Sequence, residues 1–284
     1  NDLFVNAVLQ NTEGVLRLAT PPAPDLSYIR SSLLPNLCEA VVKNERYFND
    51  FSIFEEAQVF FDQNYSSDYD ETESLPLQRR HIGAAFASSE KDVTELFRKA
   101  KGILEFMPRY THMEAFSFHK NTKPVWADDV VWMNLYLNEE KIGDFGLLSK
   151  KVSMECGVKN LSVILFELDA AMLEPLKSRT NRFTHLAEYP ETDYDISMLF
   201  ESNAMWTDIY DTIMGKKKAS ALLKDASFVD EYRGKQIPAG KKSVTIRLTI
   251  GRDEKTLTSQ EIESAAGQVM KKLGKAMGAE LRNQ

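Results

Sequence analysis

Hydrophobic and polar positions alternate most regularly near the end of the chain, between Lys242 and Ile250. Branched apolar residues occupy every second position there, starting at Val244, and polar residues fill the positions between them. Residues 193–200 alternate in the same way. Because successive side chains of a strand point to opposite faces, each pattern predicts a strand with one face in a core and one face presented to solvent.

The segments around these two strands complete a regular order of elements. Residues 205–214 have helical spacing, and residues 227–232 are typical of a strand. Thr258 and Glu261 match a capping box and predict the start of a helix. That helix carries one apolar stripe: Ile262, Ala265, Ala266, Val269, Met270, Leu273 and Met277. With a short closing strand at 279–282, the order is βαββαβ, which predicts a ferredoxin-like domain with two helices on one face of its sheet.

The rest of the chain mixes helices and strands. Apolar residues at helical spacing follow Pro35, which a helix tolerates in its first turn, and a strand at 51–61 follows. An apolar stripe that includes Leu96, Phe97 and Ile103 predicts a helix at 91–105, as core or subunit interface. Further strands are predicted at 82–87, 130–137, 142–146 and 163–168, with a hairpin turn at 138–141 and a solvated loop at 62–73.

These elements predict an α+β chain of two domains. The polar stretch at 177–182 marks the boundary between them. We therefore expect a mixed antiparallel domain over residues 1–184 and the ferredoxin-like domain over residues 185–284. The chain starts at Asn1 and soon reaches a proline-rich turn at 21–24, so we also expect it to be an N-terminally truncated piece of a longer protein.

Charge and composition limit the functions that the chain can have. The formal net charge is −7, and the acidic excess lies in residues 1–184, while residues 185–284 are balanced. A general nucleic-acid coat is expected to be basic throughout, so any RNA contact must be local. The two cysteines have no CxxC spacing, and no apolar run is long enough for a membrane helix. We predict a cytoplasmic protein without membrane contact.

The residues offer no convincing catalytic or metal site. His112, Glu114 and His119 fit neither one helical face nor a known zinc pattern, so they are interpreted as ordinary polar residues. The adjacent carboxylates at 55–56 and at 128–129 would point to opposite faces of a strand and would not converge. We therefore predict no catalytic residues and no metal ligands.

One run of residues resembles a known family. Residues 232–243 read Tyr-Arg-Gly-Lys-Gln-Ile-Pro-Ala-Gly-Lys-Lys-Ser, and Arg-Leu-Thr follows at 247–249. The run closely resembles the ferredoxin-fold anticodon-binding domain that ends the phenylalanyl-tRNA synthetase β subunit. Upstream, Ile-Arg-Ser-Ser-Leu-Leu-Pro at 29–35 and Lys-Ile-Gly-Asp-Phe-Gly at 141–146 are similar to the synthetase-like domain of the same subunit.

The resemblance implies a role in translation without catalysis in this chain. The first domain resembles a class II synthetase core that has lost catalysis and serves as a scaffold for the catalytic α subunit. Class II chemistry needs two arginines that hold ATP, and neither is present after Phe54-Glu55-Glu56 or in a Gly-rich motif. The resemblance implies tRNA-Phe and the α subunit as partners, with ATP and magnesium belonging to the whole enzyme and no cofactor in this chain.

Six residues are the predicted RNA contacts. Arginine and lysine suit phosphate groups, and an aromatic ring suits an unpaired base. The predicted set is Tyr232, Arg233, Lys241, Lys242, Ser243 and Arg247. The plainer interpretation is that residues 234–240 only connect two strands and that their lysines keep the loop soluble.

A second functional class also stays open. The chain has Tyr194-Asp195 where the family usually has an Arg before this Asp, and the segment 123–129 replaces a His-Pro-Gly-Arg-like motif. These departures suit a free-standing, diverged paralogue that acts as an RNA- or protein-binding module.

Overall fold

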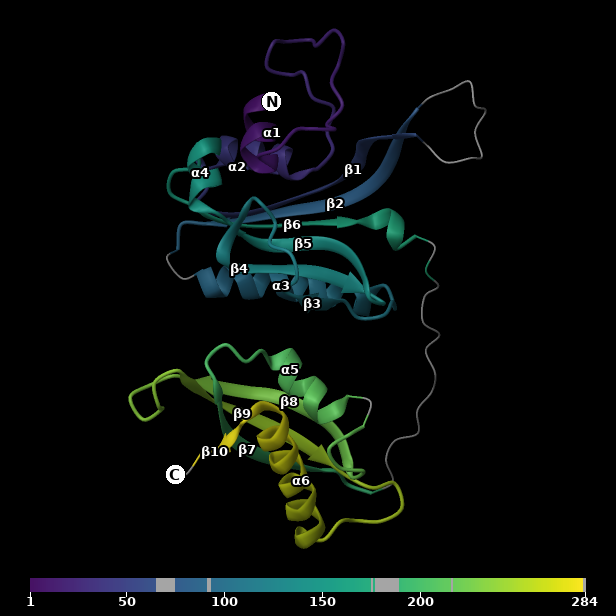
Figure 1. The fold of residues 1–284 in the computed structure, drawn as a ribbon, viewed down its shortest axis with the longest axis vertical. Coiled ribbons are helices and arrows are strands. Elements are labelled where there is room, and N and C mark those ends of the chain that lie inside the picture. The colour runs from purple at the N-terminus through teal and green to yellow at the C-terminus, as the bar shows by residue number, and fades with distance from the viewer. Residues whose placement is uncertain (65–74, 91–92, 175, 177–188, 216, 283–284) are drawn as a thin grey trace. The chain divides into compact units, whose positions relative to one another are not determined.

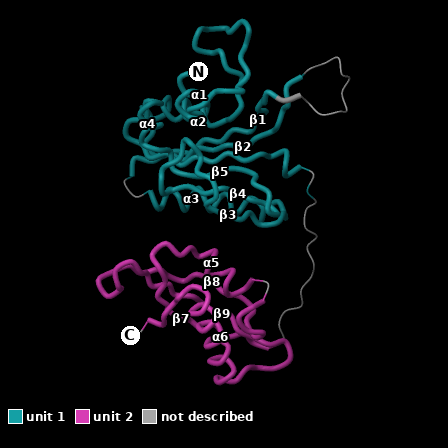
Figure 2. Tube along the Cα trace, viewed as in Figure 1, with its two compact units in different colours: residues 1–181 teal, residues 182–284 magenta. Residues whose placement is uncertain are grey.

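The computed structural model describes residues 1–64, 75–90, 93–174, 176, 189–215 and 217–282. The chain forms two compact units, Asn1–Asn181 and Arg182–Gln284, each with its own sheet and core (Figure 2). The predicted boundaries at 177–182 and at residue 184 lie outside the described residues, as does most of the predicted loop at 62–73.

The first unit contains a six-stranded antiparallel sheet (Figure 1). Its strands are β1 (Asp50–Asn64), β2 (Pro76–Ser88), β3 (Ser117–His119), β4 (Ala127–Leu137), β5 (Glu140–Leu148) and β6 (Ser162–Asp169). The order across the sheet is β1-β2-β6-β5-β4-β3. All five strand pairs are antiparallel, as the sequence predicts.

Helices cover both faces of this sheet (Figure 1). One face packs against α1 (Asp2–Leu9), α2 (Leu34–Asn44) and α4 (Lys150–Cys156). The other packs against α3 (Val93–Tyr110), and η1 (Ala170–Met172) follows β6. Alternation along the strands separates the two cores: Ala85 of β2 lies in the first cluster and Ala84 lies in the second.

Local sequence explains the helix starts and the tight turn. Pro35 stands in the first turn of α2, where its missing N–H has no intrahelical acceptor to lose. The turn between β4 and β5 needs only Asn138 and Glu139, at φ 49° and 71°, which is the left-handed geometry of a two-residue hairpin. The turn is thus shorter than the predicted four residues. Ile103 of α3, predicted on the apolar stripe, is 42% exposed.

The second unit has the predicted βαββαβ order. Its elements are β7 (Thr192–Glu201), α5 (Trp206–Met214), β8 (Leu223–Tyr232), β9 (Lys241–Ile250), α6 (Ser259–Met277) and β10 (Glu280–Leu281). The strand order is β10-β7-β9-β8, and the core lies between this sheet and the two helices. Thr258 and Glu261 form the predicted capping box at the start of α6. The α+β fold class is confirmed. Within the described ranges, no helix has both the length and the apolar character of a membrane span.

Candidate RNA-binding surface and a polar cleft

The predicted RNA contacts lie on and around the β8–β9 hairpin. Tyr232 is the last residue of β8, and Lys241 is the first residue of β9. Arg233 enters the connection, where its Nε donates to Glu231 at 2.7 Å and its Nη2 donates to the Ser202 carbonyl oxygen at 3.0 Å. Arg233 therefore ties the hairpin to the end of β7 while about half of its side chain stays exposed.

The aromatic ring of Tyr232 is partly exposed and lies against two neighbouring residues. The residue is 42% exposed, and the Arg282 guanidinium lies 5.3 Å from the centre of its ring. The ring also lies against the backbone of Gly234, where an added Cβ would overlap the tyrosine hydroxyl group. A larger residue at this position would have to push the tyrosine ring away from the loop. A ring held in this way can stack on an unpaired base, and a guanidinium beside it can contact phosphate.

Arg247 lies in the middle of β9 on the presented face of the sheet. Its guanidinium donates to both carboxylate oxygens of Asp195 on β7, at 2.8 and 2.9 Å. A hydrogen bond from Arg247, and then its charge, hold the pKa of Asp195 below the ordinary value. Thr249 donates in the same way to Asp193 at 3.0 Å. Because acidic partners stand beside the cation, this face is not a continuous positive surface.

Lys241 is also paired. Its Nζ lies 2.8 Å from a carboxylate oxygen of Glu280 on β10, and this hydrogen bond raises the pKa of Lys241. Glu280 is largely exposed, so solvent screens the pair. Lys241 keeps donors that can reach a phosphate group.

Two of the six predicted residues do not present their side chains to solvent. Ser243 is 1% exposed, and Lys242 is 7% exposed with its Nζ 2.7 Å from Glu231. Lys242 has the parity of Val244 and thus points to the helix-covered face, where it needs a carboxylate partner. Strand parity thus places Lys242 on the helix-covered face, whereas Ser243 has the parity of Arg247 and is buried on the presented face.

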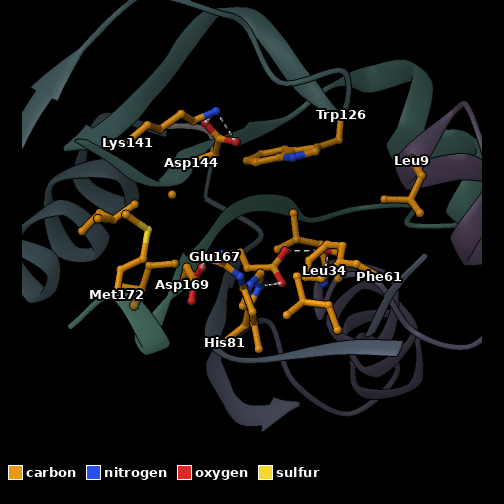
Figure 3. A pocket seen from close by; sticks show the side chains of 16 residues that line it. Leu9, Leu34, Phe61, His81, Trp126, Lys141, Asp144, Glu167, Asp169 and Met172 are labelled. Atoms are coloured by element: carbon orange, nitrogen blue, oxygen red, sulfur yellow. Dashed lines mark hydrogen bonds and ion pairs between the residues drawn. The ribbon is translucent and has the colours of Figure 1, made fainter. Parts of the chain in front are cut away.

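The first unit contains a cleft of about 440 Å³ (Figure 3). Figure 3 shows Lys141, Asp144 and Trp126 on one side of it, and His81, Glu167 and Asp169 on the other. These polar side chains come from three neighbouring strands, β5, β6 and β2. The cleft therefore lies on one face of the sheet.

Glu167 is the most heavily bonded group of the cleft. One of its oxygens accepts from the Leu33 backbone N–H at 2.9 Å, and the other accepts from the Ser32 hydroxyl at 2.5 Å. His81 Nδ1 lies 2.8 Å from the first oxygen. Since a carboxylate only accepts, His81 carries its proton on Nδ1 in this contact. Glu167 thereby joins the start of α2 to the sheet.

Two further charge pairs line the cleft. Arg79 donates to Asp169 at 2.6 Å, and Asp169 also caps η1 by accepting from the Ala171 N–H. Lys141 Nζ lies 2.8 Å from Asp144, which accepts in addition from the Asn134 amide at 2.6 Å. Each carboxylate thus has its own cation or donor. In the part of the chain that the structure describes, no three His, Cys, Asp or Glu side chains are grouped as a metal site requires.

Comparison with known proteins accounts for both units. A family model described as "Phenylalanyl tRNA synthetase beta chain CLM domain" matches residues 2–170, which is more than half of the chain. The chain belongs to the phenylalanyl-tRNA synthetase β chain family. A second model, "Ferredoxin-fold anticodon binding domain", matches residues 187–282. The resemblance found in the sequence is confirmed for both units.

The curated relatives include β subunits of phenylalanine–tRNA ligase from several bacteria. The phenylalanine–tRNA ligase β subunit of Carboxydothermus hydrogenoformans is 31% identical over 287 residues, covering 99% of this chain and 34% of the relative. That of Syntrophotalea carbinolica is 26% identical over 275 residues, covering 94% of this chain and 33% of the relative. This chain therefore spans about a third of the length of these β subunits. Among solved structures, pyrrolysyl-tRNA synthetase from Desulfitobacterium hafniense aligns with 59% of this chain and 64% of its own, at a TM-score of 0.39 and 10% identity, which is too distant to carry any inference.

Sequence reasoning did not find the polar cleft of this β-chain family member, nor Arg282 beside Tyr232. A signal for the cleft is present in β6, where Val163 and Leu165 continue in the same parity as Glu167 and Asp169. A core-facing row that turns acidic is unusual, because a buried carboxylate needs partners. The matching change from apolar to polar residues in β2 could be placed beside that of β6 only once the strand order was known, and the sequence does not give this order.

Proposed function

We propose that this chain is a non-catalytic part of a phenylalanyl-tRNA synthetase β subunit. Its second unit binds the anticodon region of tRNA-Phe, and its first unit docks on the catalytic α subunit. The observation that carries the proposal is the match of both family models, in order, to one chain whose anticodon-type unit presents Tyr232 between Gly234 and Arg282.

The RNA-binding surface of the proposal comprises Tyr232, Arg233, Lys241 and Arg247, with Arg282 added. Each of these side chains is exposed or partly exposed, with Lys241 the lowest of the ion-paired ones at 22%, whereas Lys242 and Ser243 are buried. The ring of Tyr232 supplies stacking on an unpaired loop base, a contact worth roughly 1–3 kcal/mol. The basic side chains supply phosphate contacts whose strength falls as salt rises.

Docking on the α subunit is supported by exposed apolar side chains on the α3 side of the first unit. Phe106 and Tyr110 are 55% and 75% exposed, and their ring centres lie 5.7 Å apart. A hollow of about 300 Å³ between α3 and β4 is lined by Val93, Phe97 and Val130, among others. Exposed apolar groups that gather in this way mark protein interfaces.

Catalysis is assigned to the partner subunit. ATP and magnesium then belong to the whole enzyme, whose product is tRNA-Phe charged with phenylalanine, in the cytoplasm. The proposed role is therefore to position RNA and to support the α subunit.

A crossed binding experiment tests the two parts of this function separately. The chain is titrated with a tRNA-Phe anticodon stem-loop and an unrelated stem-loop at low and physiological salt, and in parallel with purified α subunit. Tyr232→Ala is expected to weaken binding to the cognate loop about tenfold or more and to leave α-subunit binding unchanged. Tyr110→Ala, which removes a tyrosine of the other unit that is 75% exposed, is expected to do the reverse.

The rival function is a free-standing, diverged paralogue. Asp195 favours it, since this carboxylate neutralises Arg247 on the presented face. Equal, salt-sensitive binding to both stem-loops together with no binding to the α subunit would support the paralogue and contradict the proposed function.

A further inference from the structure

One face of the first sheet packs against α1, α2 and α4. On this face, apolar residues give way to charged and polar residues along three neighbouring strands. In β6 the row continues from Leu165 to Glu167 and Asp169, and in β2 from Ala85 to His81 and Arg79. In β5 it reaches Asp144, which pairs with Glu167 in the sheet register. Because the three changes coincide at one end of neighbouring strands, they form a polar floor beside an apolar core (Figure 3).

Apolar side chains wall this floor. The cleft volume of about 440 Å³ is within the range of small-molecule sites. Trp126 is 5% exposed, so its position is set by packing. The other apolar lining residues include Leu9, Leu34, Phe61, Leu77 and Met172. A ligand that fits must therefore have an apolar body as well as a polar group.

The carboxylates of the floor are already satisfied. Glu167 accepts three hydrogen bonds, and Asp144 and Asp169 each have two partners. A cationic ligand would have to displace Lys141 or Arg79 from its carboxylate partner. The positive charge of that side chain would also repel the ligand. The floor is thus poorly suited to an amine.

The two cations of the polar floor, Arg79 and Lys141, have N–H donors beyond those that contact their carboxylate partners. A guanidinium has five N–H donors, and among the described residues Arg79 uses only Nη1, toward Asp169. Lys141 has three donors and contacts only Asp144 in that same part of the chain. Both side chains are about two-fifths exposed, so they can turn toward an incoming anion without losing their carboxylate partners.

We propose that this cleft is a binding site for a small amphipathic carboxylate, whose anionic group is held by Arg79 and Lys141 and whose aromatic or branched apolar body lies against Trp126 and Phe61. A nucleoside triphosphate fits poorly, because its several negative charges exceed two cations that are already shared with carboxylates. The site shares no residue with the RNA-binding surface, since all its residues belong to the first unit.

Four matched probes test the chemistry of the ligand. The full chain is titrated, by calorimetry and by ligand-observed NMR, with 3-phenylpropionate, 4-methylpentanoate, 3-phenylpropylamine and L-phenylalanine. L-phenylalanine differs from 3-phenylpropionate only by its ammonium group. Saturable binding of at least one of the two simple carboxylates is expected, with the amine and the amino acid each bound about tenfold more weakly or not at all.

Matched variants test the residues. Arg79→Gln and Lys141→Gln are each expected to weaken carboxylate binding about fivefold or more, because each removes one charge-assisted contact. Arg80→Gln is the control: Arg80 is the next residue of β2, and its guanidinium pairs instead with Glu56 and Glu174. Circular dichroism checks that each variant is folded, and Arg79→Met replaces Arg79→Gln if that variant is not.

Three results would overturn the proposal. One is the absence of saturable binding of both carboxylates at concentrations up to about 10 mM, because any affinity would then be weaker than the millimolar range. Another is binding of L-phenylalanine or the amine as tight as that of the carboxylate. The third is an equal loss of affinity in Arg80→Gln and Arg79→Gln. None of these results bears on RNA or α-subunit binding.

Discussion

Arg247 of β9 and Asp195 of β7 face each other across the second sheet, joined by two hydrogen bonds of 2.8 and 2.9 Å. Both side chains are more than two-fifths exposed, so solvent screens the pair and its contribution to stability is small. Its effect on binding is different. A carboxylate beside the central cation of the presented face both orients the guanidinium and opposes the approach of a phosphate group.

Removing that carboxylate is therefore expected to strengthen RNA binding. Asp195→Asn should raise the affinity for the anticodon stem-loop about two- to fivefold at low salt, with little change in stability. Fluorescence anisotropy at two salt concentrations measures this effect. Asp208→Asn, a carboxylate in the first turn of α5, is the control and should change affinity less. Weaker binding in Asp195→Asn would show that the carboxylate positions Arg247 more than it repels RNA.

Substitution of Ser243 tests whether this residue is only buried in the second unit or also contacts RNA. Its Oγ has no hydrogen-bond partner among the described residues and is inaccessible to solvent. Ser243→Ala removes an unsatisfied polar atom, so the free energy of unfolding should be unchanged or rise by about 1 kcal/mol. RNA affinity should stay within about twofold, since a buried hydroxyl makes no phosphate contact. Urea unfolding followed by amide NMR of β9, and the same anisotropy assay, give both values.

The pair between Lys242 and Glu231 is expected to matter for stability. Lys242 has only 9% of its side chain exposed, so Glu231→Ala leaves a nearly buried cation without its partner. The second unit should lose about 2 kcal/mol, below the usual cost for a fully buried pair because Glu231 is 30% exposed. The double variant Glu231→Leu with Lys242→Met should recover most of this loss. Hydrogen exchange of the β8 and β9 amides measures it, with Lys241→Ala as the control, because the partner of Lys241, Glu280, is largely exposed.

Acid should weaken the second unit through the same carboxylate. Burial works to raise the pKa of Glu231, but hydrogen bonds from Lys242 and Arg233 outweigh burial and lower it. Because the folded pKa lies below the unfolded value of about 4.3, the stabilisation is complete above pH 4.3. It is lost as the pH falls below that value through the folded pKa. Urea midpoints of β9 amide signals between pH 6 and pH 3 should show this fall, and Glu231→Leu with Lys242→Met should reduce it.

Cys38 of α2, which lies beside Cys156 of α4, is expected to stay unreactive in the folded chain. A hydrogen bond with Cys156, together with burial, raises the pKa of the Cys38 thiol well above its ordinary value. Since the thiolate is the reactive form, a maleimide or aromatic disulfide reagent should label Cys38 roughly a hundredfold more slowly in the native chain than in the unfolded chain. Mass spectrometry over time measures labelling of each cysteine. Fast labelling of Cys38 in native buffer would contradict its burial between the helices and the sheet.

The sequence predicted the second unit better than the first for a physical reason. The strand at 242–250 and the capped helix after Thr258 depend on local alternation and local hydrogen bonds, and both are present in β9 and α6. In the first unit, sequence analysis did not predict α1, α4 or β3. These elements are eight, seven and three residues long, and their stability comes from packing on distant strands.

The sequence by itself determined the α+β class, the βαββαβ order and the family, because each depends on periodicity or on one continuous run of residues such as 232–243. Only the tertiary structure decided which of the six predicted residues reach solvent. It placed Lys242 and Ser243 inside the unit and set Arg282, from the far end of the chain, beside Tyr232. The same holds for the cleft, whose residues lie on separate strands that become neighbours only when the sheet forms. Long-range pairing and burial are properties of the whole fold, so no local pattern could specify them.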